Sequence, residues 1–481
     1  MNREKKNLLL IIKIVLTGIL LIVFSFFTFQ ILKLNVLPIK YLCIGFGVFI
    51  LLFIFLMFFL YKIRNKIINF ISIILLLIIS IILLVGIKYI ISTYSFIENI
   101  KAGYDTLSYS VLVLNNNEFS NLEDLRDKTI LYLENGYQEE IKKQLKEKMI
   151  YQESLNEELG SVLNSLLNRE VQAIVLEESY ITIAKDEIEN FEDKIKIVYS
   201  FEIIEKAYIE SEINENHIEV ITKPFILYIS GIDQWGNVNS VRGRSDVNQL
   251  AVINPITHHI LLVNTPRDYY VQLNGTKGLK DKLTHAGIYG IEKSIRTLED
   301  LYETDIAHYL RVNFNTVVQL VDVIGGIEVY SDKAFKPRND KRFIEKGWNT
   351  FDGKLALAYA RERFAYTTGD HHRGANQQQV ITAIIEKVTK SNILISKYNS
   401  ILNTLNGSFQ TDMSMNEITS FIKYQLDKMP IWKIESIAVT GSGSMNYTYS
   451  MGSNYKLYVM EPDMRSVNIA KQKIEEILNE K

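Results

Sequence analysis

The chain has 481 residues, of which 47% are hydrophobic and 7 are proline, so it is too long for one ordinary domain and too apolar to be mostly disordered. Its formal net charge of -2 argues against a protein that coats nucleic acid by bulk charge. The single cysteine, Cys43, excludes a disulfide scaffold and a cysteine-based zinc site, because each needs a second thiol.

Charge is distributed unevenly along the chain. Residues 1–97 carry 10 basic and 1 acidic side chain, residues 98–215 carry 12 and 26, and residues 216–481 carry 31 and 28. The corresponding net charges are +9, -14 and +3. Together with changes in sequence pattern, these boundaries predict three parts: an N-terminal anchor, a small accessory domain and a large C-terminal domain.

The first part is predicted to cross a membrane three times. Apolar runs at about residues 8–32, 41–61 and 67–91 each have the roughly 20 residues that span a bilayer core of about 30 Å. Basic residues before the first run and between the second and third place those flanks in the cytoplasm by the positive-inside rule. The N-terminus is therefore expected to be cytoplasmic, and residues 98–481 are expected outside the cell membrane.

The second part, residues 98–215, is predicted to form a small α/β domain. Charged helical stretches alternate with short β-rich runs at residues 110–114, 129–133, 171–176 and 195–199. This part contains no histidine and no catalytic or metal-binding pattern. We therefore expect an accessory role for it.

The third part, residues 216–481, mixes strands and helices over a longer segment. We expect helices at residues 283–302, 314–323, 354–363, 375–389 and 415–428, and strands at 224–233, 248–255, 258–266 and 325–331. This mixture predicts a large α/β/α-type domain with a mixed central sheet.

Arginine and acidic residues gather at the ends of these expected elements, where packing does not require them. Asp233 closes the first strand, a position at which loops of α/β folds meet ligands. Arg244 and Asp246 lie two residues apart, so an extended segment directs both side chains to the same side. The remaining members are Arg267, which follows a strand, Arg361 and Arg363, which end a helix, Arg373, which lies in the loop before the next helix, and Gln377, which follows one helical turn later.

This set of residue types is suited to phosphate chemistry. Arginine is permanently charged and planar, so it binds phosphate oxygens in a bidentate manner. Mg²⁺ is commonly held by one or two carboxylates together with phosphate oxygens, and Asp233 with Asp246 would suffice. Each group alone also fits a surface salt bridge or a solvated loop. Their joint placement at element ends favours a pyrophosphate site with a divalent cation.

Other catalytic patterns are absent from the sequence. It has no GxSxG nucleophile elbow, no HExxH zinc motif and no GxxxxGK[ST] phosphate loop. His258 and His259 are expected to be solvated in a turn between strands. His285 and His308 flank a predicted helix without an acidic partner that the sequence can identify.

The order of the motifs resembles the LytR-CpsA-Psr (LCP) family of bacterial cell-wall enzymes, in the arrangement of its capsule-associated, CpsA-like members. The resemblance is closest over residues 224–390 and rests on the strings SGID, VRGRSDVNQLAVINP, HHILLVNTPRDYYV, GGIEVYSD, LALAYARERF and GDHHRGANQQQVI. The three-span anchor and the accessory domain are also similar to the capsule-type architecture.

The resemblance implies an LCP catalytic domain and a Mg²⁺-dependent phosphotransferase in the membrane of a Gram-positive bacterium. Such an enzyme attaches capsular polysaccharide, or a related glycopolymer, from an undecaprenyl-pyrophosphate carrier to peptidoglycan. By motif position the catalytic residues are Arg267, Arg244, Asp233 and Asp246, with the two aspartates holding Mg²⁺. The pyrophosphate contacts are Arg244, Arg267, Arg361, Arg363, Arg373 and Gln377.

The family also implies an apolar tunnel for the lipid tail, for which residues 314–323 and 380–385 are candidates. His371 and His372 stand where many relatives have an amide-acid pair. This departure leaves the expected phosphate contacts intact, but the motif then does not define the acceptor or the polymer. Two alternative functions remain open from the residues. One is a non-enzymatic membrane regulator acting on the capsule-synthesis machinery, and the other is a lipid-pyrophosphate hydrolase that uses water as acceptor.

Overall fold

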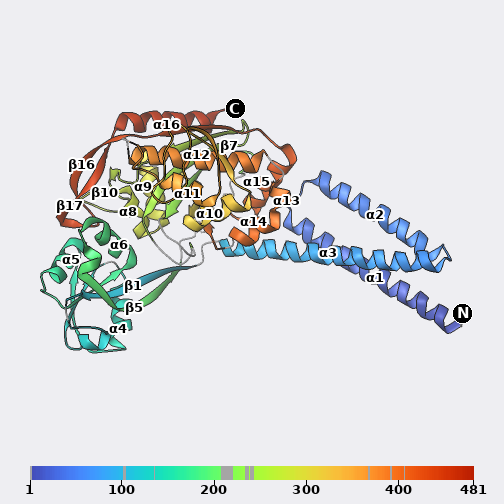
Figure 1. Cartoon of the computed structure of the whole chain (residues 1–481), viewed down its shortest axis with the longest axis horizontal. Helices are drawn as coiled ribbons and strands as arrows, with labels where there is room; N and C mark the ends of the chain where they lie inside the picture. The colour runs from blue at the N-terminus through green and yellow to red at the C-terminus, as the bar shows by residue number, and fades with distance from the viewer. Residues whose placement is uncertain are drawn as a thin grey trace.

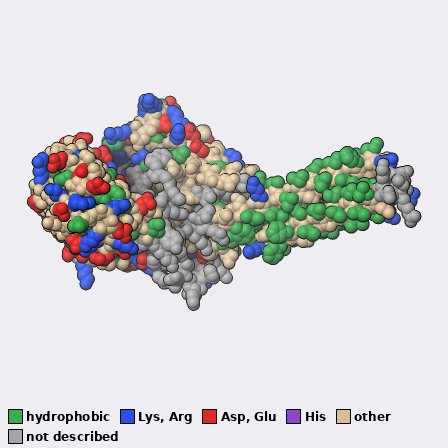
Figure 2. Space-filling view, turned by 90° about the horizontal axis from the view of Figure 1, so that it is seen from below, with side chains coloured by type: hydrophobic (Ala, Val, Ile, Leu, Met, Phe, Trp, Pro, Cys, Tyr) green, Lys and Arg blue, Asp and Glu red, His purple; other side chains and the backbone are tan. Residues whose placement is uncertain are grey.

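Three long apolar helices form the N-terminal part of the chain and project from the rest of the molecule (Figure 1). The computed structural model describes residues 3–100, 104–116, 118–134, 136–206, 220–232, 238, 243–366, 369–390, 393–405 and 407–481. The helices are α1 (Arg3–Leu34), α2 (Ile39–Tyr61) and α3 (Lys66–Ile100), each long and apolar enough to cross a membrane. Their outer surface is a continuous band of hydrophobic side chains (Figure 2), as expected for lipid contact.

A polar contact ties the three helices together. The Lys13 Nζ in α1 donates to the Leu60 carbonyl oxygen of α2 and to Asn69 Oδ1 of α3, both at 2.6 Å. Beyond the membrane-length segment, α3 continues to the C-terminal domain, where the Phe96 ring packs 5.8 Å from the Phe409 ring. The anchor is therefore in direct contact with the large domain.

The accessory domain is a five-stranded mixed sheet covered by helices on both faces. Its strand order is β3-β2-β4-β1-β5, with β2 parallel to β3 and β4, and β1 antiparallel to β4 and β5. The strands are β1 (Tyr104–Leu114), β2 (Thr129–Leu133), β3 (Gln152–Asn156), β4 (Ala173–Glu177) and β5 (Ile195–Lys206), and the helices are α4 (Gln138–Lys146), α5 (Leu159–Leu167), α6 (Glu178–Glu187) and α7 (Phe191–Lys194). The α/β expectation is confirmed, although β3 and α6 carry no signal strong enough to predict them.

The large domain is built on a six-stranded mixed sheet of order β14-β11-β6-β7-β8-β15. Strand β6 is parallel to β11, β8 is parallel to β15, and the other neighbours are antiparallel. The strands of this sheet are β6 (Phe225–Ile232), β7 (Ser245–Asn254), β8 (His259–Asn264), β11 (His308–Val312), β14 (Phe409–Thr411) and β15 (Lys433–Ala438).

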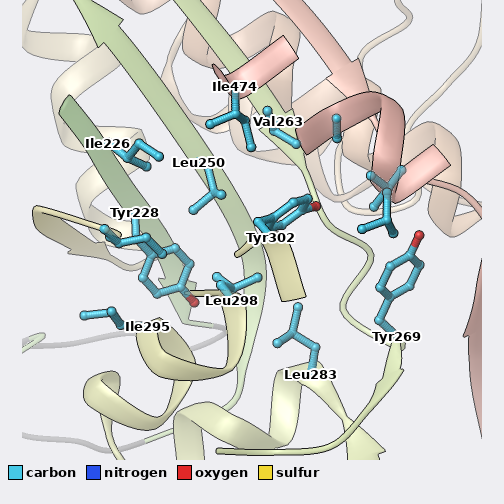
Figure 3. Close-up of a cluster of buried hydrophobic side chains, with 14 of the residues drawn as sticks. Ile226, Tyr228, Leu250, Val263, Tyr269, Leu283, Ile295, Leu298, Tyr302 and Ile474 are labelled. Carbon is cyan, nitrogen blue, oxygen red and sulfur yellow. The ribbon is translucent and has the colours of Figure 1, made fainter. Parts of the chain in front are cut away.

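Helices cover both faces of this sheet, which confirms the α/β/α arrangement. On one face, alternate strand residues such as Tyr228, Leu250 and Val263 are buried against α9 and α16, forming a closely packed core (Figure 3). On the other face lie α10, α11, α12 and α15. The covering helices are α8 (Leu283–Ala286), α9 (Ile291–Tyr302), α10 (Phe314–Val323), α11 (Gly353–Arg361), α12 (Asp370–Thr389), α13 (Ile393–Ser396), α14 (Tyr398–Leu405), α15 (Met415–Lys428) and α16 (Met464–Asn479).

Short two-stranded ladders complete the domain. They pair β9 (Tyr270–Val271) with β10 (Asp281–Lys282), β12 (Ile327–Ser331) with β13 (Gly347–Phe351), and β16 (Gly441–Thr448) with β17 (Gly452–Pro462). The expected continuous helix over residues 283–302 is wrong. It is broken into α8, a single turn at Gly287–Tyr289 and α9, because Gly290 adopts a φ of 107°, which a helix interior does not allow.

The accessory domain and the large domain share one hydrophobic core. Ile288, Met451 and Leu457 of the large domain are buried in the same cluster as the helices α5 and α6 of the accessory domain. Gly160 at the start of α5 lies so close to the β16–β17 hairpin that an added Cβ would meet the Met451 carbonyl oxygen at 2.5 Å. The accessory domain is thus packed firmly on the large domain.

Candidate functional site

A cavity of about 850 Å³ lies between the central sheet of the large domain and the helices of its second face. It is lined by residues from β6, β7, β8, β11, α10, α11, α12 and α15. The structure brings the sequence-predicted site residues together in this one cavity, namely Arg244, Asp246, Arg267, Arg361, Arg363, Arg373 and Gln377. Asp233, the remaining predicted site residue, lies outside the described residues.

A β-bulge directs Asp246 into the cavity. Gly231 pairs with Val247 and Ile232 pairs with Ser245, so Asp246 is an extra residue without a partner on β6. Further along β7, Ala251 and Ile253 face the cavity, whereas Leu250 and Val252 face the packed core. Simple alternation would place Asp246 with the core residues, and the bulge shifts it to the cavity side.

Asp246 forms a buried ion pair with Arg267. The Arg267 Nη1 donates to Asp246 Oδ2 at 2.7 Å, and the Thr284 hydroxyl donates to Asp246 Oδ1 at 2.9 Å. Burial opposes ionisation of this carboxyl, but the guanidinium groups of Arg267, Arg244 and Arg373 outweigh it and hold the pKa of Asp246 well below its usual range. Asp246 is therefore a fixed negative charge among arginines.

The segment after α11 places two arginines at the mouth of the cavity. Between them, Glu362 is buried and accepts hydrogen bonds from the backbone N–H groups of Arg338, Phe364 and Ala365 at 2.6 to 3.0 Å. Glu362 therefore shapes the loop, while Arg361 and Arg363 on either side line the cavity. The Arg361 guanidinium lies 4.0 Å from the centre of the Phe314 ring.

The N-terminal turns of α12 contribute Arg373 and Gln377, both 9% exposed. This helix approaches β8 closely at Gly374, where an added Cβ would meet Asn264 Nδ2 at 2.2 Å. Glycine is thus needed to bring the helix start to the strand end. The positive end of the helix dipole then adds to the arginine charges at the cavity mouth.

The other end of the cavity is apolar. Along α12 the lining residues run from Arg373 to Thr389, which corresponds to about 24 Å at 1.5 Å per residue. The predicted tunnel helices contribute Phe314, Val317, Leu320, Val380, Ile381, Ile384 and Ile385 to this lining. The cavity is therefore a deep apolar channel with a cationic mouth, a shape suited to an amphiphile with an anionic head.

Several lining residues had no usable sequence signal. Phe421 of α15 and Trp432 close the apolar end, and Arg338 with Asn339 adds to the mouth. Asp186, at the end of α6 in the accessory domain, also lines the cavity. Its carboxylate accepts a hydrogen bond from Arg244 Nη1. This contact joins residues that are 58 positions apart in different domains, so no local pattern could have found it.

Three of the histidines differ from expectation. His259 is 5% exposed rather than solvated, with its Nδ1 2.8 Å from Glu480 Oε2. His285 has a buried acidic partner in Asp281 at 2.7 Å. His308 lies between the carboxylates of Asp412 and Glu417, at 3.5 and 3.4 Å. These groups support the fold and do not line the cavity.

His372, one of the two positions at which the sequence departs from the family motif, stacks on Tyr366, with the ring centres 3.3 Å apart. Its Nε2 lies 3.9 Å from Asp332 Oδ1. The side chain of His371 lies outside the described set. The ring stack places His372 beside the loop that carries Arg363 and Tyr366.

The mouth of the cavity offers the carboxylate of Asp246 as a ligand for a divalent cation. Asp246 is ionised and offers hard carboxylate oxygens in a pocket whose other charges are cationic. Among the described residues, no group of three or more His, Cys, Asp or Glu gathers as a self-sufficient metal site. Any cation here would therefore need ligand oxygens from the bound substrate.

Comparisons with known proteins assign most of the large domain to a protein family. The LytR_cpsA_psr family model matches residues 195–466. Polyisoprenyl-teichoic acid–peptidoglycan teichoic acid transferase TagU of Enterococcus faecalis is 32% identical over 248 residues, which cover 51% of this chain and 78% of that protein. The TagU protein of Bacillus cereus is 31% identical over 223 residues, covering 46% and 70%.

One further relative has a different name, and one solved structure is similar in fold. Biofilm regulatory protein A of Streptococcus mutans is 30% identical over 211 residues, covering 41% of this chain and 52% of that protein. The crystal structure of B. subtilis TagV is similar with a TM-score of 0.45 and 27% identity, covering 54% of this chain and 98% of that one. Because the family model spans more than half of the sequence, the chain belongs to the LytR-CpsA-Psr family.

Proposed function

We propose that the protein is a membrane-anchored phosphotransferase that attaches a glycopolymer from a polyprenyl-pyrophosphate carrier to peptidoglycan. The observation that carries this proposal is the cavity, which extends for about 24 Å along α12 from a mouth lined by six arginines to an apolar end. The channel matches a polyprenyl tail, and the arginines match a pyrophosphate. Relatives named as polyisoprenyl-teichoic acid–peptidoglycan transferases support the same reaction class.

The proposed step is a displacement at the phosphorus that carries the polymer. The acceptor hydroxyl oxygen of peptidoglycan forms a bond to this phosphorus, and the bond to the bridging oxygen of the pyrophosphate breaks. Polyprenyl monophosphate leaves with the electron pair, and the hydroxyl proton passes to a base. Arg244, Arg267 and Arg373 stabilise the negative charge that develops on the phosphate oxygens.

Asp246 is better suited to holding charge than to accepting the proton. A general base works best when its pKa lies near the working pH, and arginines hold the pKa of Asp246 far below that. We propose that Asp246, together with Asp233, contributes oxygen ligands to Mg²⁺ on the pyrophosphate. The ion would supply further neutralisation of phosphate charge when bound. The remaining predicted contacts, Arg361, Arg363 and Gln377, orient the same phosphates.

The anchor supports the proposed lipid substrate. Leu320 lines the apolar part of the cavity and also packs in the cluster that contains Phe96 of α3. The side chain of Lys40, at the start of α2, forms an ion pair with Asp427 of α15 at 3.1 Å. The membrane helices thus end beside the apolar end of the channel, where a lipid tail would enter. We propose that the N-terminus is cytoplasmic and that this large domain lies outside the cell.

The transferred polymer is either capsular polysaccharide or a teichoic acid. The three-helix anchor and accessory domain favour the capsule-type donor, whereas the relatives' names refer to teichoic acid. We propose the capsule-type donor. Competition between the two purified lipid-linked polymers for one acceptor separates them, and exclusive use of the teichoic acid donor would reject this part.

The test is a transfer reaction with the full-length protein in nanodiscs. A polyprenyl-pyrophosphate-linked saccharide, Mg²⁺ and peptidoglycan fragments are incubated together, and products are identified by mass spectrometry. A phosphodiester-linked saccharide–glycan adduct is expected. Free saccharide phosphate would indicate the lipid-pyrophosphate hydrolase instead, and lipid binding without turnover would indicate the non-enzymatic regulator.

A matched pair of variants assigns the activity to the cavity. Arg267→Ala removes a mouth arginine and should abolish the adduct. Arg296→Ala removes an arginine of α9 that pairs with Glu299 at 2.8 Å on the opposite face of the sheet, and this variant should still form the adduct. Full activity in both variants would show that the reaction does not use this site.

A further inference from the structure

One carboxylate of the cavity mouth comes from the accessory domain. Asp186, in the last turn of α6, accepts a hydrogen bond from Arg244 Nη1 and forms an ion pair with it. The Arg244 side chain is 11% exposed, whereas that of Asp186 is 49% exposed. The family model begins at residue 195, so Asp186 lies outside the segment that defines the family, whereas Arg244 lies within it.

The accessory domain holds Asp186 in place through several independent contacts. Its helices share a buried core with the β16–β17 hairpin. The Gly160 N–H donates to the Met451 carbonyl oxygen at 3.0 Å, and the Tyr180 and Tyr289 rings meet edge to face with their centres 6.4 Å apart. Next to Asp186, Glu187 accepts a hydrogen bond from Lys282 at 2.6 Å. Asp186 is therefore a fixed part of the mouth, not a chance contact of a loose domain.

The charge balance of the mouth shows what this carboxylate does. Among the described lining residues, six arginines face only two carboxylates, Asp186 and Asp246. Asp246 is buried and is already engaged by Arg267 and Thr284. Asp186 is half exposed and holds an arginine that the proposed function assigns to the donor's pyrophosphate. A phosphate that binds Arg244 must therefore displace this carboxylate or bind against its charge.

We propose that Asp186 is a specificity-determining residue of the donor site, which lowers its affinity for anions by competing for Arg244. Only a head group with enough negative charge to replace the carboxylate, such as a pyrophosphate, then binds productively. The accessory domain thereby sets the donor affinity of the large domain. This inference rests on the proposed function for the identity of the donor, but its test measures binding and not transfer.

The test compares two adjacent substitutions. Asp186→Asn keeps an oxygen that accepts from Arg244 but removes the negative charge. Glu187→Gln makes the same change one residue later, at an interdomain ion pair with Lys282 that does not line the cavity. Both full-length variants are assayed in nanodiscs by calorimetric titration with geranylgeranyl diphosphate and with inorganic pyrophosphate.

Asp186→Asn should bind both probes about tenfold more tightly than the unmodified protein, and Glu187→Gln should stay within about twofold of it. Asp186→Ser, with the same expected sign, guards against a folding defect of the first variant, and melting temperatures check all three. Unchanged or weaker binding in Asp186→Asn and Asp186→Ser would overturn the inference. If inorganic pyrophosphate shows the expected gain but the lipid probe does not bind, the proposed function fails while the role of Asp186 stands.

Discussion

Filling the channel from its wall should weaken lipid binding while leaving the fold intact or more stable. Ala251 on β7 lines the cavity and lies between Leu227 and Leu262 on the neighbouring strands. Ala251→Leu adds three carbon atoms that project into apolar space. At about 0.8 kcal/mol per methylene, a lipid tail that loses equivalent contacts is bound about 2.4 kcal/mol less tightly, which corresponds to about 50-fold in Kd.

The same substitution should not reduce stability. The new side chain enters an existing cavity of about 850 Å³, so it does not overpack the core. Burial of its added carbons should raise the free energy of unfolding by up to about 2 kcal/mol. The opposite signs of the two effects distinguish a ligand channel from an ordinary, imperfectly packed core.

The neighbouring residue provides the control. Val252 is fully buried and faces the packed core on the other side of the sheet. Val252→Leu should lower the free energy of unfolding by about 1–3 kcal/mol and leave lipid binding unchanged. Geranylgeranyl diphosphate titration and chemical unfolding measure both quantities for both variants. If Ala251→Leu binds the lipid as tightly as the unmodified protein, the tail does not lie in this channel.

Three further outcomes are expected. Asp246→Asn should abolish transfer and lower the free energy of unfolding by about 2 kcal/mol, because it removes a charge-assisted bond to Arg267; an equally stable variant in thermal unfolding would contradict the buried pair. Arg373→Ala should reduce the transfer rate by roughly 100-fold or more without changing the melting temperature by more than a few degrees, and a near-normal rate would exclude Arg373 from the site. Burial disfavours the charged form of His308, but two carboxylates, including Glu417, outweigh it and raise its pKa to about 9. The contribution of the charged His308 to the free energy of unfolding is complete below about pH 6.5, and about 3 kcal/mol of it is lost as the pH rises to about 9. Chemical unfolding at about pH 6.5 and at about pH 9 should show this loss in the unmodified protein and not in His308→Gln.

The sequence allows the prediction that these arginines lie close together because they stand at element ends, and the structure places them in one cavity. A side chain such as Arg267, directly after a strand, can be assigned to the edge of a sheet without knowing the strand order. The anchor is predictable for a similar reason, since the length of an apolar run is a local property. The order of the six strands and the sharing of one core between two domains are not local, and the sequence does not indicate them.

Two features of the site depend on tertiary structure in different ways. The bulge at Asp246 changes the face on which one side chain lies, and strand alternation alone would predict the opposite face. Asp186 reaches Arg244 only because the accessory domain packs on the hairpin β16–β17, far from both residues in the sequence. The composition shows that the accessory domain is acidic, but it does not show which carboxylate contacts the large domain; the structure identifies Asp186 through its contact with Arg244.

From the sequence alone, the strand residues that line the channel cannot be distinguished from residues of a packed core. Alternate residues of β6, β7 and β11 facing the cavity are apolar, as they would be in a packed layer, and the pattern of a strand does not depend on what covers it. The difference lies in the helices: α8, α9 and α16 fill the space over the other face of the sheet, whereas α10 and α12 stand off and leave a cavity of about 850 Å³.

The two ends of this cavity meet different parts of the chain. The apolar end lies near Phe96 of α3, and the cationic mouth includes Asp186 of the accessory domain. The membrane helices and the accessory domain lie on opposite sides of the large domain (Figure 1). A polyprenyl-pyrophosphate polymer has the same order of chemistry along its length, from lipid to phosphate to sugar. For the proposed substrate, the sugar end therefore lies at the mouth, next to an accessory domain whose net charge of -14 would repel a negatively charged polymer.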